Sequence, residues 1–161
     1  MEVRMAQVSD AEAMAAIYNA EVTGSTVTFD IEPRSVADQR RWIERHQGAH
    51  PAVVAVEGAV VVGFGSLSPF RDRAAYSTTV EDSVYVDEAH RGRGVGRLLL
   101  EELVSLAEKQ GFHTVIARTS GDNVPSIALH QRCGFTQVGV EREVGRKFGR
   151  WVDVAILQLL L

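Results

Sequence analysis

Residues 91–96 read Arg-Gly-Arg-Gly-Val-Gly, and they separate a β-forming run that ends at Val86 from an apolar-periodic segment at 97–110. Glycines let a backbone approach phosphate oxygens without a Cβ clash. A helix N-terminus offers free N–H groups and a positive dipole end. Three arginines in and beside the segment add positive charge. The segment therefore predicts a pyrophosphate-binding loop between a strand and a helix.

The position of this loop bears on two alternative interpretations. A dinucleotide-binding fingerprint normally opens the first βαβ unit of a domain. Here the glycines lie past the middle of the chain, after several strand-like segments. An ordinary tight turn with solvated arginines stays open on the loop alone, because short glycine motifs are not specific.

The composition is that of one globular domain, residues 1–161, with 45% hydrophobic and 24% charged residues. The formal net charge of −4 gives no support for a nucleic-acid partner. A single cysteine excludes an internal disulfide and fits a reducing cytoplasm. No CxxC or HExxH motif favours a metal site. No signal peptide and no membrane-spanning apolar run is expected.

The segments around the loop predict alternating strands and helices. Ser9 and Ser35 are expected to cap two helices, the first of which breaks at 24–26. Further helices are expected at 97–110 and 123–132. Strands are expected at 3–8, 52–56, 60–67, 78–86, 114–118, 135–140 and 152–160. Residues 27–29 and 69–75 are predicted to be loops. The order predicts an α/β (α+β) fold, a mixed sheet with helices on both faces.

Several separated motifs match a known family in the same order. Arg91-x-x-Gly94-x-Gly96 matches its Q/R-x-x-G-x-G/A signature, and Asn123-x-x-Ser126 and Gly134-Phe135 match a later segment. Over essentially its whole length the chain resembles the GNAT superfamily of N-acetyltransferases. It is most similar to the phosphinothricin and L-methionine sulfoximine acetyltransferase branch. That closer match rests on Ala16-Ile17-Tyr18-Asn19, Glu32-Pro33, Thr79-Val80-Glu81, Ser83-Val84-Tyr85-Val86, Pro125-Ser126 and Gly145-x-Lys147-Phe148-Gly149-x-Trp151-x-Asp153.

The resemblance implies a GNAT fold and acetyl-CoA as co-substrate, with no metal. In that fold the fourth strand carries a bulge and splays from the fifth, and pantetheine lies in the gap. The residues implied to contact the cofactor are Val84, Tyr85, Val86, Arg91, Gly92, Arg93, Gly94, Val95, Gly96, Arg97, Asn123 and Ser126.

Acetyl transfer to an amine needs a base, because an alkylammonium cannot attack a thioester. Glu81 is the candidate, since partial burial on a Val- and Tyr-rich strand would raise its pKa. The backbone N–H of Val84 is the expected oxyanion donor. His130 is expected to act as the acid for the thiolate or to orient water, with packing in its helix as the plainer alternative. Tyr85 is a second candidate acid.

The acceptor is expected to be a small amine beside Glu81. Arg71 and Arg73 form a fork suited to an α-carboxylate, unless they are simply solvated. The predicted acceptor site also contains Phe29, Asp72, Tyr76, Asp82 and Ser83. The resemblance implies L-methionine sulfoximine, L-methionine sulfone or L-phosphinothricin as acceptor and a homodimer as assembly.

Other readings of the acceptor stay open. A polyamine, an aminoglycoside or a protein N-terminus are alternative acceptors, and a non-catalytic acyl-CoA-binding module is an alternative function. Lys147, Trp151 and Asp153 either cover the acceptor cavity or form a dimer contact.

Overall fold

The computed structural model describes residues 1–161 and contains seven strands and four α-helices. The strands are β1 (Glu2–Met5), β2 (Ala52–Glu57), β3 (Val60–Pro69), β4 (Thr79–Val86), β5 (Thr114–Ser120), β6 (Thr136–Lys147) and β7 (Arg150–Leu160). The helices are α1 (Ala11–Gly24), α2 (Val36–Arg45), α3 (Val95–Lys109) and α4 (Val124–Arg132). None of these helices combines the length and the apolar character that crossing a membrane requires.

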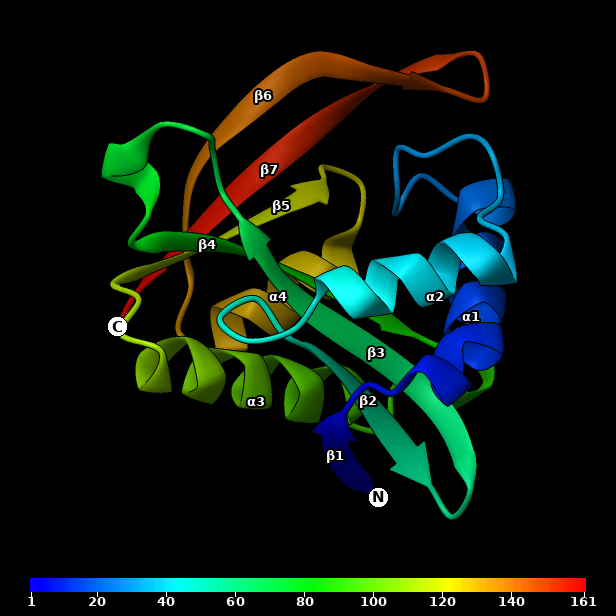
Figure 1. The fold of residues 1–161 in the computed structure, drawn as a ribbon. Helices are drawn as coiled ribbons and strands as arrows, with labels where there is room; N and C mark the ends of the chain where they lie inside the picture. The colour runs from blue at the N-terminus through cyan, green and yellow to red at the C-terminus, as the bar shows by residue number, and fades with distance from the viewer.

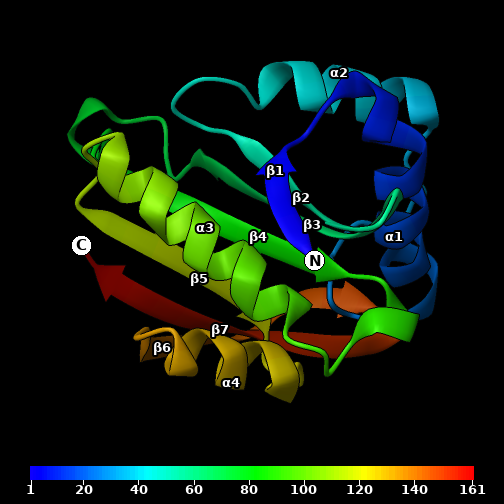
Figure 2. The ribbon, with the colours of Figure 1, turned by 90° about the horizontal axis from the view of Figure 1, so that it is seen from below.

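All seven strands form one mixed sheet in the order β1-β2-β3-β4-β5-β7-β6. Only the β4–β5 pair is parallel. Two separate apolar cores lie on the two faces of the sheet. On β3, Phe64 packs with α1 and α2, whereas the neighbouring Gly63 and Gly65 face α3. Figures 1 and 2 show α1 and α2 on one side of the sheet and α3 and α4 on the other. The predicted mixed sheet with helices on both faces is confirmed.

The strands β4 and β5 part halfway along their length. Their pairing covers only Thr79–Asp82 against Thr114–Ala117. Beyond that point β4 stays paired with β3 as far as Val86, and β5 stays paired with β7 as far as Ser120. The expected splay is therefore confirmed. The expected bulge in β4 is not found, because the β3–β4 register is continuous and each strand simply keeps its other partner.

The start of α1 differs from the prediction. β1 ends at Met5 and not at residue 8 as predicted, and a short 3₁₀ turn at Val8–Asp10 precedes the helix. The carboxylate of Asp10, not Ser9, organises this turn, because it accepts the Gln7 N–H at 2.8 Å and pairs with Arg4 at 2.8 Å. The predicted Ser9 cap is wrong because the ion pair of the buried Asp10 with the half-buried Arg4 fixes this turn.

The C-terminal hairpin is longer than predicted. Strands expected at 135–140 and 152–160 instead run from Thr136 to Lys147 and from Arg150 to Leu160. They meet at a tight turn in which Phe148 and Gly149 have positive φ angles of 52° and 72°. Much of β6 is exposed, so its polar residues interrupt the apolar alternation that marks a strand in sequence.

Candidate active site

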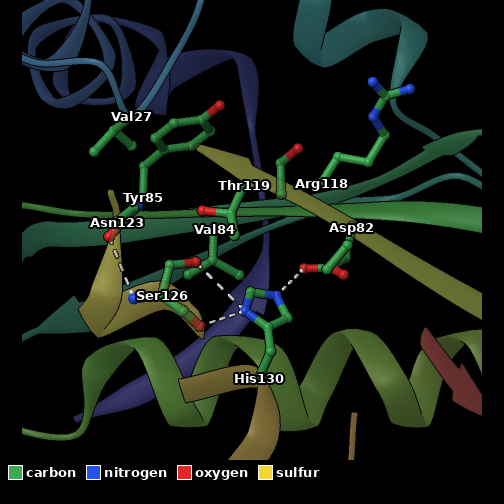
Figure 3. Close-up of a pocket in the computed structure, with 11 residues that line it drawn as sticks. Val27, Asp82, Val84, Tyr85, Arg118, Thr119, Asn123, Ser126 and His130 are labelled. Carbon is green, nitrogen blue, oxygen red and sulfur yellow. Dashed lines mark hydrogen bonds and ion pairs between the residues drawn. The ribbon is translucent and has the colours of Figure 1, made fainter. Parts of the chain in front are cut away.

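A small pocket lies where β4 and β5 part (Figure 3). Its walls come from β4, β5, α4 with the residue before it, and the loop after α1. The lining residues are Val27, Asp82, Ser83, Val84, Tyr85, Ala117, Arg118, Thr119, Asn123, Ser126 and His130. Seven of these residues were predicted from the sequence. The structure brings them together, from distant parts of the chain, at one gap in the sheet.

Side-chain alternation along β4 gives the pocket two different sides. Tyr85 projects toward the α1 side with Arg118, whereas Asp82 and Val84 project toward α4 (Figure 3). Glu81 shares the face of Tyr85 because both occupy odd positions of the strand. Asp82 therefore faces His130 and does not fit the acceptor-binding role predicted for it, since adjacent residues of a strand point to opposite faces.

The backbone of Val84 faces the gap. The carbonyl of Thr78, just before β4, accepts the N–H groups of Thr114 and His113 beside it. Backbone polar groups alternate with a period of two, so the N–H and C=O of Val84 point to the same side as those of Thr78. Val84 has no β5 partner there. An unpaired strand edge of this kind fits an amide-bearing arm and a thioester oxygen.

The glycine loop opens directly onto the N-terminus of α3. Gly92 and Gly94 adopt left-handed conformations, with φ of 73° and 85°, and a Cβ on either would have no atom within 4 Å. Gly94 precedes the helix, and no side chain caps it. Free helix N–H groups beside open space are the features that a pyrophosphate needs. The loop therefore fits the diphosphate of CoA.

The arginines around this loop have acidic partners within the chain. Arg91 pairs with the buried Glu21 of α1, and its Nε donates to the Val86 carbonyl at 3.3 Å. Arg93 pairs with Glu57 at 2.7 Å, and Arg97 pairs with Glu101 at 2.7 Å. Their contacts with phosphate stay a prediction, and Arg91 would have to share its charge with Glu21.

Glu81 combines partial burial with two nearby cations. Desolvation raises the pKa of its carboxyl group, and Asp82 raises it further, while the charges of Arg118 and Arg71 oppose that shift. The net direction is upward. A carboxylate with a raised pKa is a stronger base than an ordinary glutamate.

His130 forms a buried pair with Asp82 across the gap. Its Nε2 lies 2.9 Å from Asp82 Oδ2, and its Nδ1 lies 2.7 Å from the carbonyl of Ser126. Both ring nitrogens thus face acceptors, which favours the doubly protonated imidazolium. Desolvation lowers the pKa of His130, but the hydrogen bond and charge of Asp82 outweigh it and the net direction is upward. Asp82 Oδ1 is buried without a hydrogen-bond partner.

Tyr85 is less suited to proton donation than His130. Its ring packs against Tyr18 and Phe64, with centroids 5.2 and 5.1 Å away. The loss of water around its hydroxyl raises the pKa of Tyr85 well above the usual value. A phenol with a raised pKa is a weaker acid, so His130 is the better of the two candidates.

The arginine-bearing loop forms a second hollow beside Glu81, lined by Phe70, Arg71, Asp72, Arg73 and Tyr76. The Arg71 guanidinium lies over the rings of Phe70 and Tyr76, at 4.7 and 5.5 Å from their centroids. Phe29 lies elsewhere, with its ring against Gly145 of β6. Phe29 and Tyr76, both predicted for the acceptor site, therefore do not line the same hollow.

The loop between α1 and α2 is held down by residues that sequence reasoning assigned to other roles or missed. Lys147 of β6 is buried and donates to the carbonyl of Thr28 at 2.8 Å. Asp122, which precedes α4, accepts from Thr26 at 3.0 Å and pairs with Arg150. Lys147 therefore serves its own chain and is not available for a dimer contact. No local pattern signals these contacts, because their partners lie 28 to 119 residues apart in the sequence.

Arg118 is the main pocket residue that sequence reasoning missed. It occupies a strand position that read simply as part of an apolar run, 114–118. A charged residue at the end of such a run was the available signal. Asn123, by contrast, was predicted, and its side chain caps α4 by accepting the Ser126 N–H at 3.3 Å. No group of His, Cys, Asp or Glu side chains is arranged to hold a metal ion.

Comparisons with known proteins agree with this geometry. A model of the acetyltransferase (GNAT) family matches residues 14–135. An L-methionine sulfoximine/L-methionine sulfone acetyltransferase of Pseudomonas paraeruginosa is 38% identical over 99% of this chain and 94% of its own. A phosphinothricin N-acetyltransferase of Streptomyces coelicolor is 37% identical over 96% of this chain and 93% of its own. The crystal structure of a phosphinothricin acetyltransferase from Sinorhizobium meliloti, in complex with acetyl-CoA, is 36% identical, covers 99% and 88% of the two chains, and superposes with a TM-score of 0.95.

Proposed function

The chain belongs to the acetyltransferase (GNAT) family and is an acetyl-CoA-dependent N-acetyltransferase, and from that premise we propose that it acetylates the α-amino group of small amino-acid analogues. The observation that carries the proposal is the position of Glu81. This partly buried carboxylate with a raised pKa lies one residue before Asp82, where β4 and β5 part, and the charge of Arg71 in the second hollow acts on it. The relatives named for methionine sulfoximine, methionine sulfone and phosphinothricin support that acceptor class.

In this proposal the free edge of β4 and the glycine loop hold acetyl-CoA. The unpaired backbone at Val84 binds the arm near the thioester, and the N-terminus of α3 binds the diphosphate. Asn123 and Ser126 border the same gap. Open space at Gly92 and Gly94 supports the fit, since a side chain there would occupy the phosphate position.

Glu81 removes a proton from the acceptor ammonium, directly or through water, and frees the amine for attack. The Val84 N–H then donates to the thioester oxygen as negative charge develops on it. His130 lines the gap from the face that carries Asp82, and it supplies a proton to the departing thiolate by exchanging its Nδ1 hydrogen bond to the Ser126 carbonyl for one to the sulfur. Base and acid therefore act from different faces of the sheet and do not neutralise one another.

Arg71 is proposed to bind the α-carboxylate of the acceptor, with Arg73 beside it. Arg71 lies in the hollow next to Glu81 and acts electrostatically on that carboxylate. Its stacking on Tyr76 restricts the guanidinium before the acceptor arrives, which reduces the entropic cost of binding. A fork of this kind recognises carboxylates in a bidentate manner.

The test is release of the free CoA thiol in the presence of methionine sulfoximine, methionine sulfone, phosphinothricin, a polyamine, an aminoglycoside and a peptide. We expect turnover with the amino-acid analogues, and mass spectrometry should place the acetyl group on the α-nitrogen. Turnover of the polyamine, aminoglycoside or peptide alone would contradict the proposed acceptor class. No turnover of any amine, together with binding of acetyl-CoA, would indicate a non-catalytic module.

We further propose that the protein works as a cytoplasmic homodimer. Exposed apolar side chains on the C-terminal hairpin support the dimer; they are Val138, Val140, Val144, Phe148 and Trp151. Exposed apolar side chains that gather on one element support an interface there. Light scattering of the purified protein should give twice the mass of the chain, and a monomeric mass would refute the assembly.

A further inference from the structure

Arg118 is a pocket residue to which the proposed chemistry gives no role. It directly follows Ala117, the last residue of β5 that pairs with β4. Its side chain projects to the same side of the sheet as Tyr85 (Figure 3). That side also carries Glu81, because Ile116 is its register partner and Arg118 lies two positions further along β5. Arg118 therefore borders the acceptor side of the gap.

Glu81 consequently lies within the field of two arginines from different elements. Arg71 belongs to the loop before β4, and Arg118 belongs to β5, and the charges of both act on the Glu81 carboxylate. An acceptor ammonium at Glu81 therefore experiences the positive charge of both guanidinium groups. Such a position is unfavourable for a polycation and favourable for an acceptor that brings its own anions.

The α-carboxylate of an amino acid neutralises only one of these two arginines. The other, Arg118, is paired with Glu141 of β6. The side chains of Arg118 and Glu141 are 34% and 37% exposed, and an ion pair of that exposure contributes little to stability. A substrate anion can therefore replace Glu141 at small cost.

We propose that Arg118 is a specificity-determining residue that binds a second anionic group, carried by the side chain of the acceptor. The preferred acceptors are then α-amino acids that end in a phosphinate or carboxylate, in preference to neutral sulfones of similar length. This inference rests on the proposed function, because it assumes that Arg71 takes the α-carboxylate and that the amine meets Glu81.

The experiment compares kcat/KM for phosphinothricin, whose phosphinate is anionic, with that for the neutral methionine sulfone. Arg118→Gln removes the charge and keeps most of the side-chain length. We expect it to lower kcat/KM for phosphinothricin about tenfold, mainly through KM, because a charge-assisted hydrogen bond is lost. The value for methionine sulfone should stay within about twofold of wild type, since a neutral group gains little from a charged partner.

Two further variants test whether the effect is specific to Arg118. Glu141→Gln removes the internal competitor for Arg118, so it should raise kcat/KM for phosphinothricin and leave methionine sulfone unaffected. Arg41→Gln is a matched control, because Arg41 is an exposed arginine of α2 that pairs only with Asp38. It should leave both acceptors unchanged.

The outcomes separate the two proposals. If both compounds are acetylated and Arg118→Gln lowers both equally, Arg118 acts through Glu81 and the recognition role is overturned. The same holds if Arg118→Gln changes neither. If wild-type protein acetylates neither compound, the proposed function itself fails and the inference fails with it.

Discussion

The most specific arrangement at the level of single residues is the buried pair of Asp82 and His130. Since both nitrogens of His130 face acceptors, Asp82 favours the protonated imidazole and raises its pKa. Asp82→Asn removes the charge and should lower the pKa of His130, measured by NMR titration of the ring. Asp87→Asn alters another Asp–His pair, which is only partly buried, and serves as the control. An unchanged His130 titration in Asp82→Asn would exclude this positioning role.

The same pair predicts a pH dependence of stability. The pKa of His130 is raised in the folded protein, so its contribution is fully present below the unfolded value and is lost as pH rises through the folded one. Urea unfolding should show wild type losing its advantage over Asp82→Asn across that window. A difference between the two proteins that stays constant with pH would contradict the linkage.

Glu81 is the proposed general base. Glu81→Gln keeps the shape of the side chain but cannot accept a proton, so kcat should fall about a hundredfold or more at neutral pH. In wild type, kcat/KM should decline as pH falls through the pKa of Glu81. The midpoint of this decline should lie above the pKa of an ordinary glutamate. Acetyl-CoA binding should be unchanged. Retention of both full turnover and the acid limb in Glu81→Gln would assign the base elsewhere.

At the level of elements, the loop between α1 and α2 depends on Lys147 of β6. Lys147→Met preserves the length of the side chain but leaves the buried carbonyl of Thr28 without its donor. We expect the free energy of unfolding to fall by about 1–3 kcal/mol. We also expect the KM of the acceptor to rise, because Val27 of this loop lines the pocket.

Chemical denaturation and steady-state kinetics check this prediction together. Lys109→Met, at the end of α3, is the matched control and should change neither quantity. If Lys147→Met loses stability but keeps its KM, the loop is held without serving the acceptor site. If it loses neither, Lys147 does not anchor the loop.

The elements also show what the sequence can predict. The glycine loop was predictable because left-handed backbone and a free helix N-terminus are local properties of residues 91–96. The pairing of Asp82 with His130 was not, because it depends on how β4 and α4 pack across the sheet. The long β6–β7 hairpin was also missed, since an exposed strand needs no apolar alternation. Local signals therefore located the chemistry, and tertiary contacts decided which groups face each other.

For the whole molecule, the parting of β4 and β5 divides one sheet into two parts joined by four residue pairs. Acetyl-CoA is expected to bridge them, because its arm occupies the gap and its diphosphate meets the loop at the start of α3. A ligand at about 100 times its Kd stabilises a fold by about 2.7 kcal/mol, which corresponds to a rise in Tm of roughly 5–11 °C for a chain of this size.

Gly94→Val tests that bridge. Gly94 has a positive φ of 85°, so the variant should lower the Tm of the unliganded protein through backbone strain. The decisive quantity is the change in Tm on adding acetyl-CoA, which should be lost in Gly94→Val because the new side chain occupies the phosphate position. Gly48→Val is the control, since Gly48 also has a positive φ but lies after α2, outside the loop. A wild-type shift in Gly94→Val would mean that the diphosphate binds elsewhere and that the gap is closed by other contacts.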